Sequence, residues 1–176
     1  LGTAFTTNVD DVGFIRELIN SLQRSYTIDG NRIYVSGFSL GAFMCYRLAA
    51  QLSDKIAAAA IVEGAGGGRH DSTSPWVINV GSNSAQPVSM IIFQGTGNYR
   101  NGTNPLWLGG PGAYNMIYLS TNESVSLWVR HDGCSEVPRI EELSATPYDM
   151  TKYTYSGGAK GTEVLLFKVI GAAHGW

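Results

Sequence analysis

The amino-acid sequence predicts an α/β protein in which a mainly parallel sheet is flanked by helices. Two runs of strand length, 56–62 and 88–93, are almost continuously apolar, which is typical of strands covered on both faces. Segments with apolar residues at helical spacing separate the predicted strands, and this alternation indicates an α/β sheet. The sequence contains no internal repeat, low-complexity tract or domain boundary, so residues 1–176 are expected to form a single domain.

The first part of the chain predicts a helix, a strand and a second helix. Asp10 and Asp11 precede apolar residues at helical spacing, and the helix dipole favours carboxylates at a helix N-terminus. Residues 32–35 predict a short strand that runs directly into the glycine-containing segment 37–41. The helix that follows is expected to pack through Phe43, Met44, Leu48 and Ala49.

Long irregular segments separate the elements in the rest of the chain. Residues 64–87 and 97–115 are predicted to form loops, and loops of this length in compact domains are often functional. The capping-box sequence at 120–123 predicts the start of a helix. Alternation at 151–155 and an apolar run at 164–170 predict the last two strands.

Composition excludes several classes of function. Apolar residues make up 44% of the 176 positions, which excludes a disordered chain, and a net charge of −2 provides no basic surface for nucleic acid or an anionic membrane. No apolar run approaches the ~18 residues of a membrane span.

The two cysteines lack metal-binding spacing. Cys45 is expected to be a free buried thiol, with one disulfide to Cys134 as the alternative. The 22 glycines and 9 tyrosines favour an extracellular protein.

The sequence Gly37-x-Ser39-x-Gly41 lies between a predicted strand and a predicted helix. In this context it predicts a nucleophile elbow, a sharp turn that lifts the serine hydroxyl above the sheet edge and needs glycines for close backbone approach. The N–H of Leu40 would lie at the N-terminus of the following helix, where it can donate to an oxyanion. A strand–turn–helix junction with an incidental serine is the alternative interpretation.

A serine hydroxyl needs a base to become an effective nucleophile, and the chain has three histidines. His70 lies in the first long loop. His131 lies at the end of a predicted helix, where a cationic cap explains it. His174 follows the last predicted strand, which is the position of the base in α/β-hydrolases. The sequence therefore predicts His174 as general base, with an exposed terminal histidine as the alternative.

The acid of the triad is less obvious. It should follow the strand at 88–93, but Asn98 in that region carries no charge to stabilise an imidazolium. The Asp-to-Asn change in trypsin lowers turnover about 10⁴-fold. Glu63 at the end of the preceding apolar strand and Asp71 in the next loop are the alternative acids. For Glu63, a solvated strand end is the competing interpretation.

These motifs resemble the secreted polyhydroxybutyrate-depolymerase and feruloyl-esterase group of α/β-hydrolases. The resemblance extends in order over nearly the whole chain. It is carried by residues 10–15, 31–39, 46–49, 53–58, 95–96, 123–125, 133–134, 153–158 and 171–176. The resemblance implies an α/β-hydrolase fold with Ser39 as nucleophile and His174 as base.

The chain also departs from the pattern of this group. Asn98 stands where the group has its triad aspartate, and Gln94 replaces the histidine of the same motif. The group has strands and a second oxyanion-donor loop upstream, and no such loop motif precedes Ser39. The chain is therefore expected to be the C-terminal portion of a larger catalytic domain that lacks its N-terminal strands. A preceding segment or a second chain would complete the sheet.

The resulting hypothesis is a secreted serine carboxylic-ester hydrolase. Feruloyl, acetyl, short polyester and aryl esters are the substrate classes considered, and neither a metal nor an organic cofactor is implied. No nucleic-acid or membrane partner is expected. The aromatic residues that could line a substrate pocket, or simply pack in the core, are Trp76, Tyr99, Trp107 and Tyr114. The alternative is a hydrolase-like binding module whose catalytic activity is weak because Asn98 replaces the usual triad aspartate.

Overall fold

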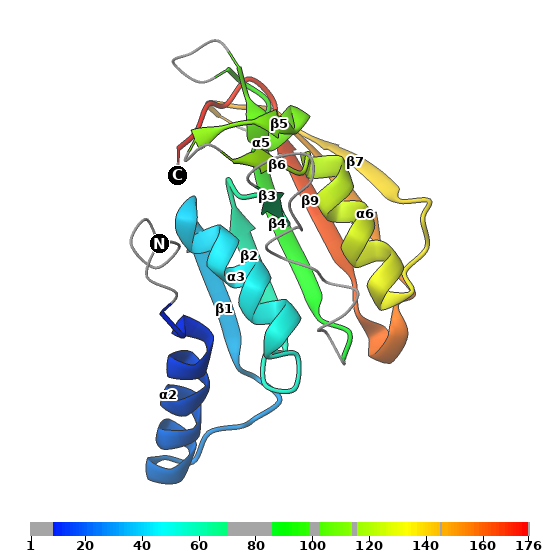
Figure 1. The fold of residues 1–176 in the computed structure, drawn as a ribbon. Helices are drawn as coiled ribbons and strands as arrows, with labels where there is room; N and C mark the ends of the chain where they lie inside the picture. Colours follow the sequence, from blue (N-terminus) through cyan, green and yellow to red (C-terminus); the bar gives the residue numbers. More distant parts are fainter. Residues whose placement is uncertain (1–8, 70–85, 99–102, 114–115, 145, 176) are drawn as a thin grey trace.

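A six-stranded sheet forms the centre of the computed structural model, which describes residues 9–69, 86–98, 103–113, 116–144 and 146–175 (Figure 1). The strands, in their order across the sheet, are β1 (Tyr34–Phe38), β2 (Ala58–Val62), β4 (Ser89–Gly95), β9 (Val164–Val169), β8 (Met150–Tyr155) and β7 (Arg139–Leu143). Strands β1, β2, β4 and β9 are parallel, and β8 and β7 continue the sheet in antiparallel pairing. The predicted α/β class with a mainly parallel sheet is confirmed.

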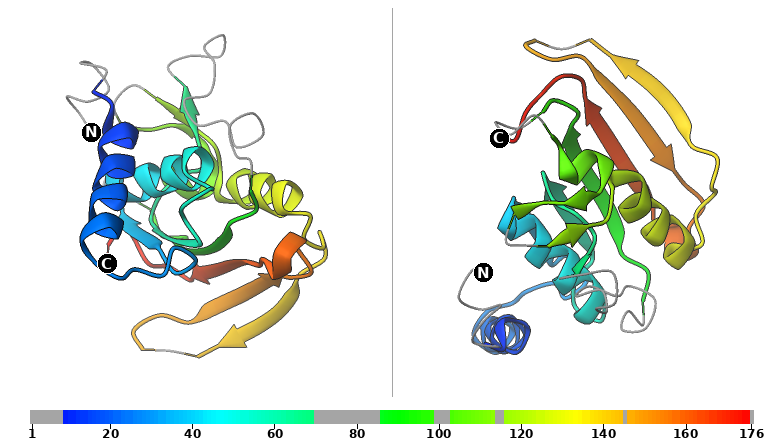
Figure 2. Two further views of the ribbon diagram at one scale, coloured as in Figure 1. Left: turned by 90° about the horizontal axis from the view of Figure 1, so that it is seen from below. Right: turned by 45° about the horizontal axis from the view of Figure 1, so that its top comes forward.

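Three long helices lie on the same side of this sheet: α2 (Asp11–Ser25), α3 (Leu40–Gln51) and α6 (Thr121–Asp132) (Figure 2). The main core lies between α3, α6 and the strands. Its largest fully buried side chains include Tyr46, Leu52, Ile61, Met90, Ile92 and Trp128. Because full burial of an apolar side chain contributes about 1.5–3 kcal/mol, this layer holds the strands in place.

The ends of the predicted helices follow the capping patterns in the sequence. The Asp10 carboxylate accepts the N–H of Gly13 at 2.8 Å and caps α2. At α6, the Ser120 hydroxyl accepts the N–H of Glu123 at 3.2 Å, and the Glu123 carboxylate accepts the N–H of Ser120 at 2.7 Å. Gly133 ends α6 in the left-handed conformation, with φ 71°. The predicted capping box is therefore confirmed.

Helix α3 packs differently from the sequence-based expectation. Leu48 and Ala49 are buried as predicted, but Phe43 and Met44 are only partly buried. The positions that instead enter the core are Ala42, Cys45, Tyr46 and Ala50. The reason is that Phe43 turns toward a second, smaller apolar cluster, in which its ring lies 5.2 Å from that of Tyr118.

That second cluster lies beneath a small sheet that the sequence did not predict. This sheet has the strand order β3 (Gly68–Arg69), β6 (Ile117–Tyr118) and β5 (Gly110–Pro111), and the short helix α5 (Pro105–Leu108) precedes β5. Strand β7 was also not predicted, because its alternation places charged residues on an exposed edge rather than apolar residues in a core. The elbow strand β1 begins two residues later than expected and extends to Phe38.

The second face of the sheet is only partly covered within the described residues. Phe93 and Phe167 pair in register on this face, with ring centroids 4.7 Å apart, and both are partly exposed. At the edge strand β1, Tyr34 is 63% exposed and Phe38 is 39% exposed. Parallel sheets are normally covered on both faces, and the residues that the structure describes leave this face and the β1 edge open to further packing.

Cys45 and Cys134 are both free buried thiols, so the alternative of a disulfide does not hold in this structure. Burial raises the pKa of the Cys45 thiol to about 11, because desolvation disfavours the thiolate.

Among the helices of the described residues, none combines the length and the apolar character that crossing a bilayer requires.

The capping box of α6 gives a stability prediction. Ser120→Ala should lower the free energy of unfolding by about 1 kcal/mol at pH 7, as for other N-cap losses. Hydrogen bonds from Ser120 lower the pKa of Glu123 in the folded state, so their contribution is present above the unfolded pKa and is lost as the pH falls. Urea unfolding at pH 7 and pH 3 should therefore show a larger penalty at pH 7. Equal penalties would contradict the linkage to Glu123.

Candidate active site

Ser39 lies in a sharp turn between β1 and α3. Its backbone has φ 56° and ψ −119°, a conformation that non-glycine residues rarely adopt. The Ser39 N–H donates to the carbonyl of Val62 at 2.9 Å, which ties the turn to the neighbouring strand. The strand–turn–helix context and the strained backbone are those of a nucleophile elbow.

The two glycines of the motif have different roles. A Cβ at Gly37 would lie 2.4 Å from the backbone carbonyl of Gly41, so this position accepts glycine only. A Cβ at Gly41 would meet nothing within 4 Å. The expectation that flanking glycines permit close approach of the backbone therefore holds at Gly37, where β1 passes the first turn of α3.

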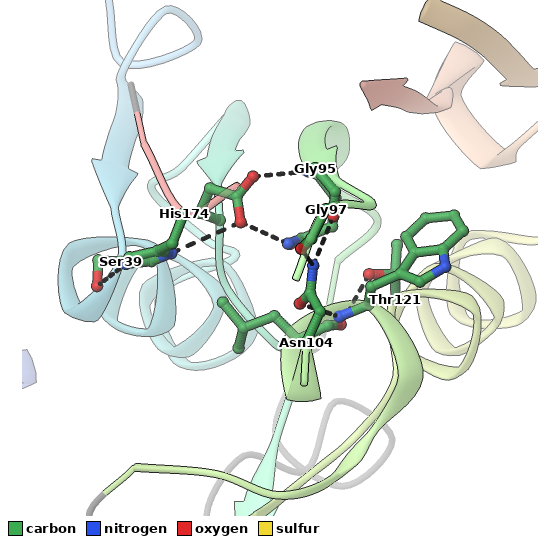
Figure 3. Close-up of polar contacts among 10 residues, drawn as sticks. Ser39, Gly95, Gly97, Asn104, Thr121 and His174 are labelled. Carbon is green, nitrogen blue, oxygen red and sulfur yellow. Dashed lines mark hydrogen bonds and ion pairs between the residues drawn. The ribbon is translucent and has the colours of Figure 1, made fainter. Parts of the chain in front are cut away.

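His174 reaches Ser39 from the loop that follows β9. Its Nε2 atom lies 2.9 Å from the Ser39 Oγ atom, within hydrogen-bonding distance (Figure 3). The imidazole also stacks on the ring of Phe38, with centroids 4.9 Å apart and an interplanar angle of 27°. Residues 135 positions apart thus meet at the carboxyl edge of the parallel strands. His131 does not reach this edge and pairs instead with Asp132 at the end of α6, while His70 lies outside the described residues.

Glu63 is the carboxylate that faces the other side of the imidazole. Its Oε2 atom lies 3.6 Å from the Nδ1 atom of His174, an ion-pair distance slightly longer than a hydrogen bond. Of the other two candidates for the acid, Asn98 is exposed and makes no hydrogen bond to the imidazole within the described residues, and Asp71 lies outside them. The structure thus brings Glu63, rather than Asn98, to the position beside His174.

The Glu63 side chain is buried and held from two directions. The residue is 3% exposed and its backbone has φ 52° at the end of β2. The Gln94 amide donates to Oε2 at 2.6 Å, and the Gly95 N–H donates to Oε1 at 2.6 Å. Buried charged groups need such partners, because an unpaired carboxylate in a protein interior is strongly destabilising. The competing interpretation of Glu63 as a solvated strand end is wrong.

The first amide of α3 lies directly beside Ser39. Leu40 is the first residue of the helix, and the first N–H groups of a helix have no intrahelical acceptor. The Leu40 N–H therefore lies at the N-terminus of α3, next in the chain to Ser39, where it is expected to donate to the oxyanion of a serine adduct. This is the environment that an oxyanion donor requires.

The candidate aromatic lining is only partly described. Trp107 lies on α5, is half-buried, and has the Lys168 ammonium 5.4 Å above its ring. Trp76, Tyr99 and Tyr114 lie outside the described residues. Within the part of the chain that the structure describes, no group of three histidine, cysteine or acidic side chains is placed to hold a metal ion.

The geometry of the elbow predicts opposite outcomes for its two glycines. Gly37→Ala should destabilise the fold by about 1–3 kcal/mol or more, because the new methyl group overlaps the Gly41 carbonyl. Gly41→Ala is the matched control and should be neutral or stabilising by up to about 1 kcal/mol, since alanine favours the helix. Thermal unfolding of both variants tests this; equal stability would show that the turn is not constrained at Gly37.

Comparisons with known proteins bear on what this site does. No family profile matches the chain. The chain is 27% identical over 172 residues to feruloyl esterase B of Piromyces equi, which covers 96% of this chain and 29% of that protein. It is 26% identical over 170 residues to poly(3-hydroxyalkanoate) depolymerase C of Paucimonas lemoignei, which covers 92% of this chain and 39% of that protein. The chain thus spans about a third of the length of these relatives.

A solved structure shares the fold. The acetyl xylan esterase from Aspergillus awamori superposes with a TM-score of 0.55 at 16% identity, covering 93% of this chain and 61% of that chain. This match confirms the α/β-hydrolase fold. The two relatives above confirm the resemblance that the motifs indicated.

Proposed function

We propose that this relative of the feruloyl esterases and polyhydroxyalkanoate depolymerases carries the nucleophile, base and acid of a serine carboxylic-ester hydrolase. The observation that carries the proposal is the line of side chains from Ser39 through His174 to Glu63, with separations of 2.9 and 3.6 Å. A hydroxyl, an imidazole and a carboxylate in this order form a catalytic triad.

In the proposed acylation step, the Ser39 Oγ atom attacks the ester carbonyl carbon while the Nε2 atom of His174 accepts the hydroxyl proton. The Leu40 N–H donates to the oxyanion, and the Glu63 carboxylate stabilises the imidazolium that forms. Collapse of the tetrahedral intermediate breaks the bond to the alkoxy oxygen. His174 gives its proton to that oxygen, so the alcohol leaves and the acyl group stays on Ser39.

Deacylation follows the same path in reverse, with water in place of the alcohol. His174 takes a proton from water as the water oxygen attacks the acyl carbon, and the second tetrahedral intermediate again places its charge near the Leu40 N–H. Its collapse returns the proton to Ser39 Oγ and releases the carboxylic acid.

Glu63 fills the role that Asn98 cannot. A neutral amide can orient an imidazole but cannot stabilise its positive charge. The carboxylate of Glu63 lies one strand nearer the elbow, at the end of β2, and faces the imidazole nitrogen that is turned away from Ser39. This placement favours catalysis over the alternative of a binding module, which was suggested by the missing aspartate.

The names of the relatives support a proposal for the substrate class. Their names specify feruloyl esters and poly(3-hydroxyalkanoate), and that of the structural neighbour specifies acetylated xylan. We propose feruloyl, acetyl or short polyester bonds of extracellular polymers as substrates, with the chain acting outside the cell.

We further propose that the chain works within a larger catalytic domain. Within the described part of the chain β1 is an edge strand, and two exposed aromatic residues lie on it, Tyr34 at its start and Phe38 directly before Ser39. Both relatives are longer than the matched region. Another strand, from a preceding segment or a second chain, would pair with β1 and supply the second oxyanion donor.

Labelling tests whether the site is a serine hydrolase. A fluorophosphonate should attach to Ser39 in the folded full-length protein, and the Ser39→Ala and His174→Ala variants should fail to label. Intact-mass analysis with peptide mapping gives the modified residue. Folded protein that binds feruloylated xylan but shows no labelling at Ser39 would support the binding module instead.

Two substitutions test the identity of the acid. Glu63→Gln should lower kcat/KM for a short-chain aryl ester about 10³- to 10⁴-fold, since an amide in this position cannot stabilise the imidazolium. Asn98→Asp is the matched control and should change kcat/KM less than about threefold. A gain of orders of magnitude in Asn98→Asp, with little loss in Glu63→Gln, would assign the acid position to residue 98.

A further inference from the structure

The geometry points to Asn104 as a positioning residue that holds the acid and the base of the proposed triad at their working separation. This inference rests on the proposed esterase function and extends it to a side chain that does not touch the triad. Asn104 lies just before α5 and is 1% exposed. Figure 3 shows it directly below the turn at Gly95 and Gly97.

All the hydrogen-bonding atoms of the Asn104 amide are in use. Its Nδ2 atom donates to the carbonyl of Gly95 at 2.9 Å and to the carbonyl of Gly97 at 2.7 Å. Its Oδ1 atom accepts the N–H of Trp107 at 3.0 Å and caps α5. The amide therefore bridges both ends of the turn 95–97 to the helix that follows it.

The same turn contacts the acid on one side and the loop of the base on the other. The Gly95 N–H donates to the Glu63 carboxylate at 2.6 Å. The Gly97 N–H donates to the carbonyl of Ala172 at 2.8 Å, and the Thr96 hydroxyl accepts the N–H of Gly171 at 2.9 Å. Residues 171–172 lead directly to His174, so one turn sets the positions of both groups.

The packing leaves no free space between the turn and the base loop. A Cβ at Gly95 would lie 2.2 Å from the Ala172 carbonyl oxygen, and one at Gly97 would lie 2.4 Å from the Gly171 carbonyl oxygen. A shift of the turn must therefore move the segment that carries His174. Two glycines also make the turn intrinsically mobile, so its geometry depends on external hydrogen bonds such as those from Asn104.

The capping of α5 does not by itself require asparagine. Serine and aspartate provide an equivalent N-cap acceptor, but neither has an NH₂ group that can donate to two carbonyls at once. Substitution by these residues therefore separates the two roles. A position that needed only a helix cap would tolerate both substitutions without a change in turnover.

The test measures hydrolysis of an aryl ester by the full-length protein and its Asn104→Ser and Asn104→Asp variants. We expect kcat to fall about 10- to 100-fold with KM within about threefold, because misplacement of catalytic groups by about 1 Å costs about 10²-fold. The rate of fluorophosphonate labelling at Ser39 should fall in parallel. The control is Asp10→Ala, which removes the cap of α2 far from the site and should lower stability without changing kcat.

A double-mutant cycle distinguishes positioning from general destabilisation. In the Glu63→Gln background, Asn104→Ser should cost clearly less than in the wild-type protein, because the part of its effect that acts through the acid is already lost. Full additivity, or unchanged kcat in both Asn104 variants, would overturn the inference while leaving the triad intact.

If both variants fail to fold, Thr96→Val tests the same turn by removing the acceptor for the Gly171 N–H, and normal turnover in that variant would overturn the inference. A wild-type protein without esterase activity or labelling would refute the triad and the positioning role together.

Discussion

The burial of one carboxylate is the constraint that organises this end of the molecule. Glu63 is almost fully buried, and a charge in that position is tolerable only when each of its oxygen atoms has a partner. Gln94 and the Gly95 backbone supply those partners, and the remaining approach to Oε2 is occupied by His174. The need to satisfy one buried group thus links β2, the end of β4 and the loop after β9, and it leaves the imidazole aimed at Ser39.

Much of the architecture could be predicted from local patterns in the sequence. The apolar runs at β2, β4 and β9 predict buried parallel strands, and the acidic and capping-box residues mark the starts of α2 and α6. The elements that were missed lack such signals. Strand β7 alternates charged residues at an exposed edge, and the small sheet consists of strands of two residues whose pairing depends on tertiary contacts.

The residues of the candidate site also fall into those that the sequence predicts and those that it does not. Ser39 and His174 could be predicted because a glycine motif and chain order place them at the ends of β1 and β9. The chain order of nucleophile, acid and base in this fold also predicts an acid after β4. The choice among Glu63, Asn98 and Asp71, however, depends on the directions of side chains at the strand ends, and no local sequence pattern encodes these directions. One signal was present: Gln94 interrupts an otherwise apolar strand, and a fully buried amide implies a buried polar partner nearby. Asn104 gave no signal beyond its place before a proline.

The position of the acid has a consequence for how the sequence of this chain can diverge. Under the proposed mechanism, position 98 is released from supplying a catalytic charge, since Glu63 at the end of the adjacent strand provides it. A change of charge at residue 98 then leaves the proposed proton transfer untouched. Position 98 can then vary in sequence, while selection on turnover acts on the strand end at residue 63.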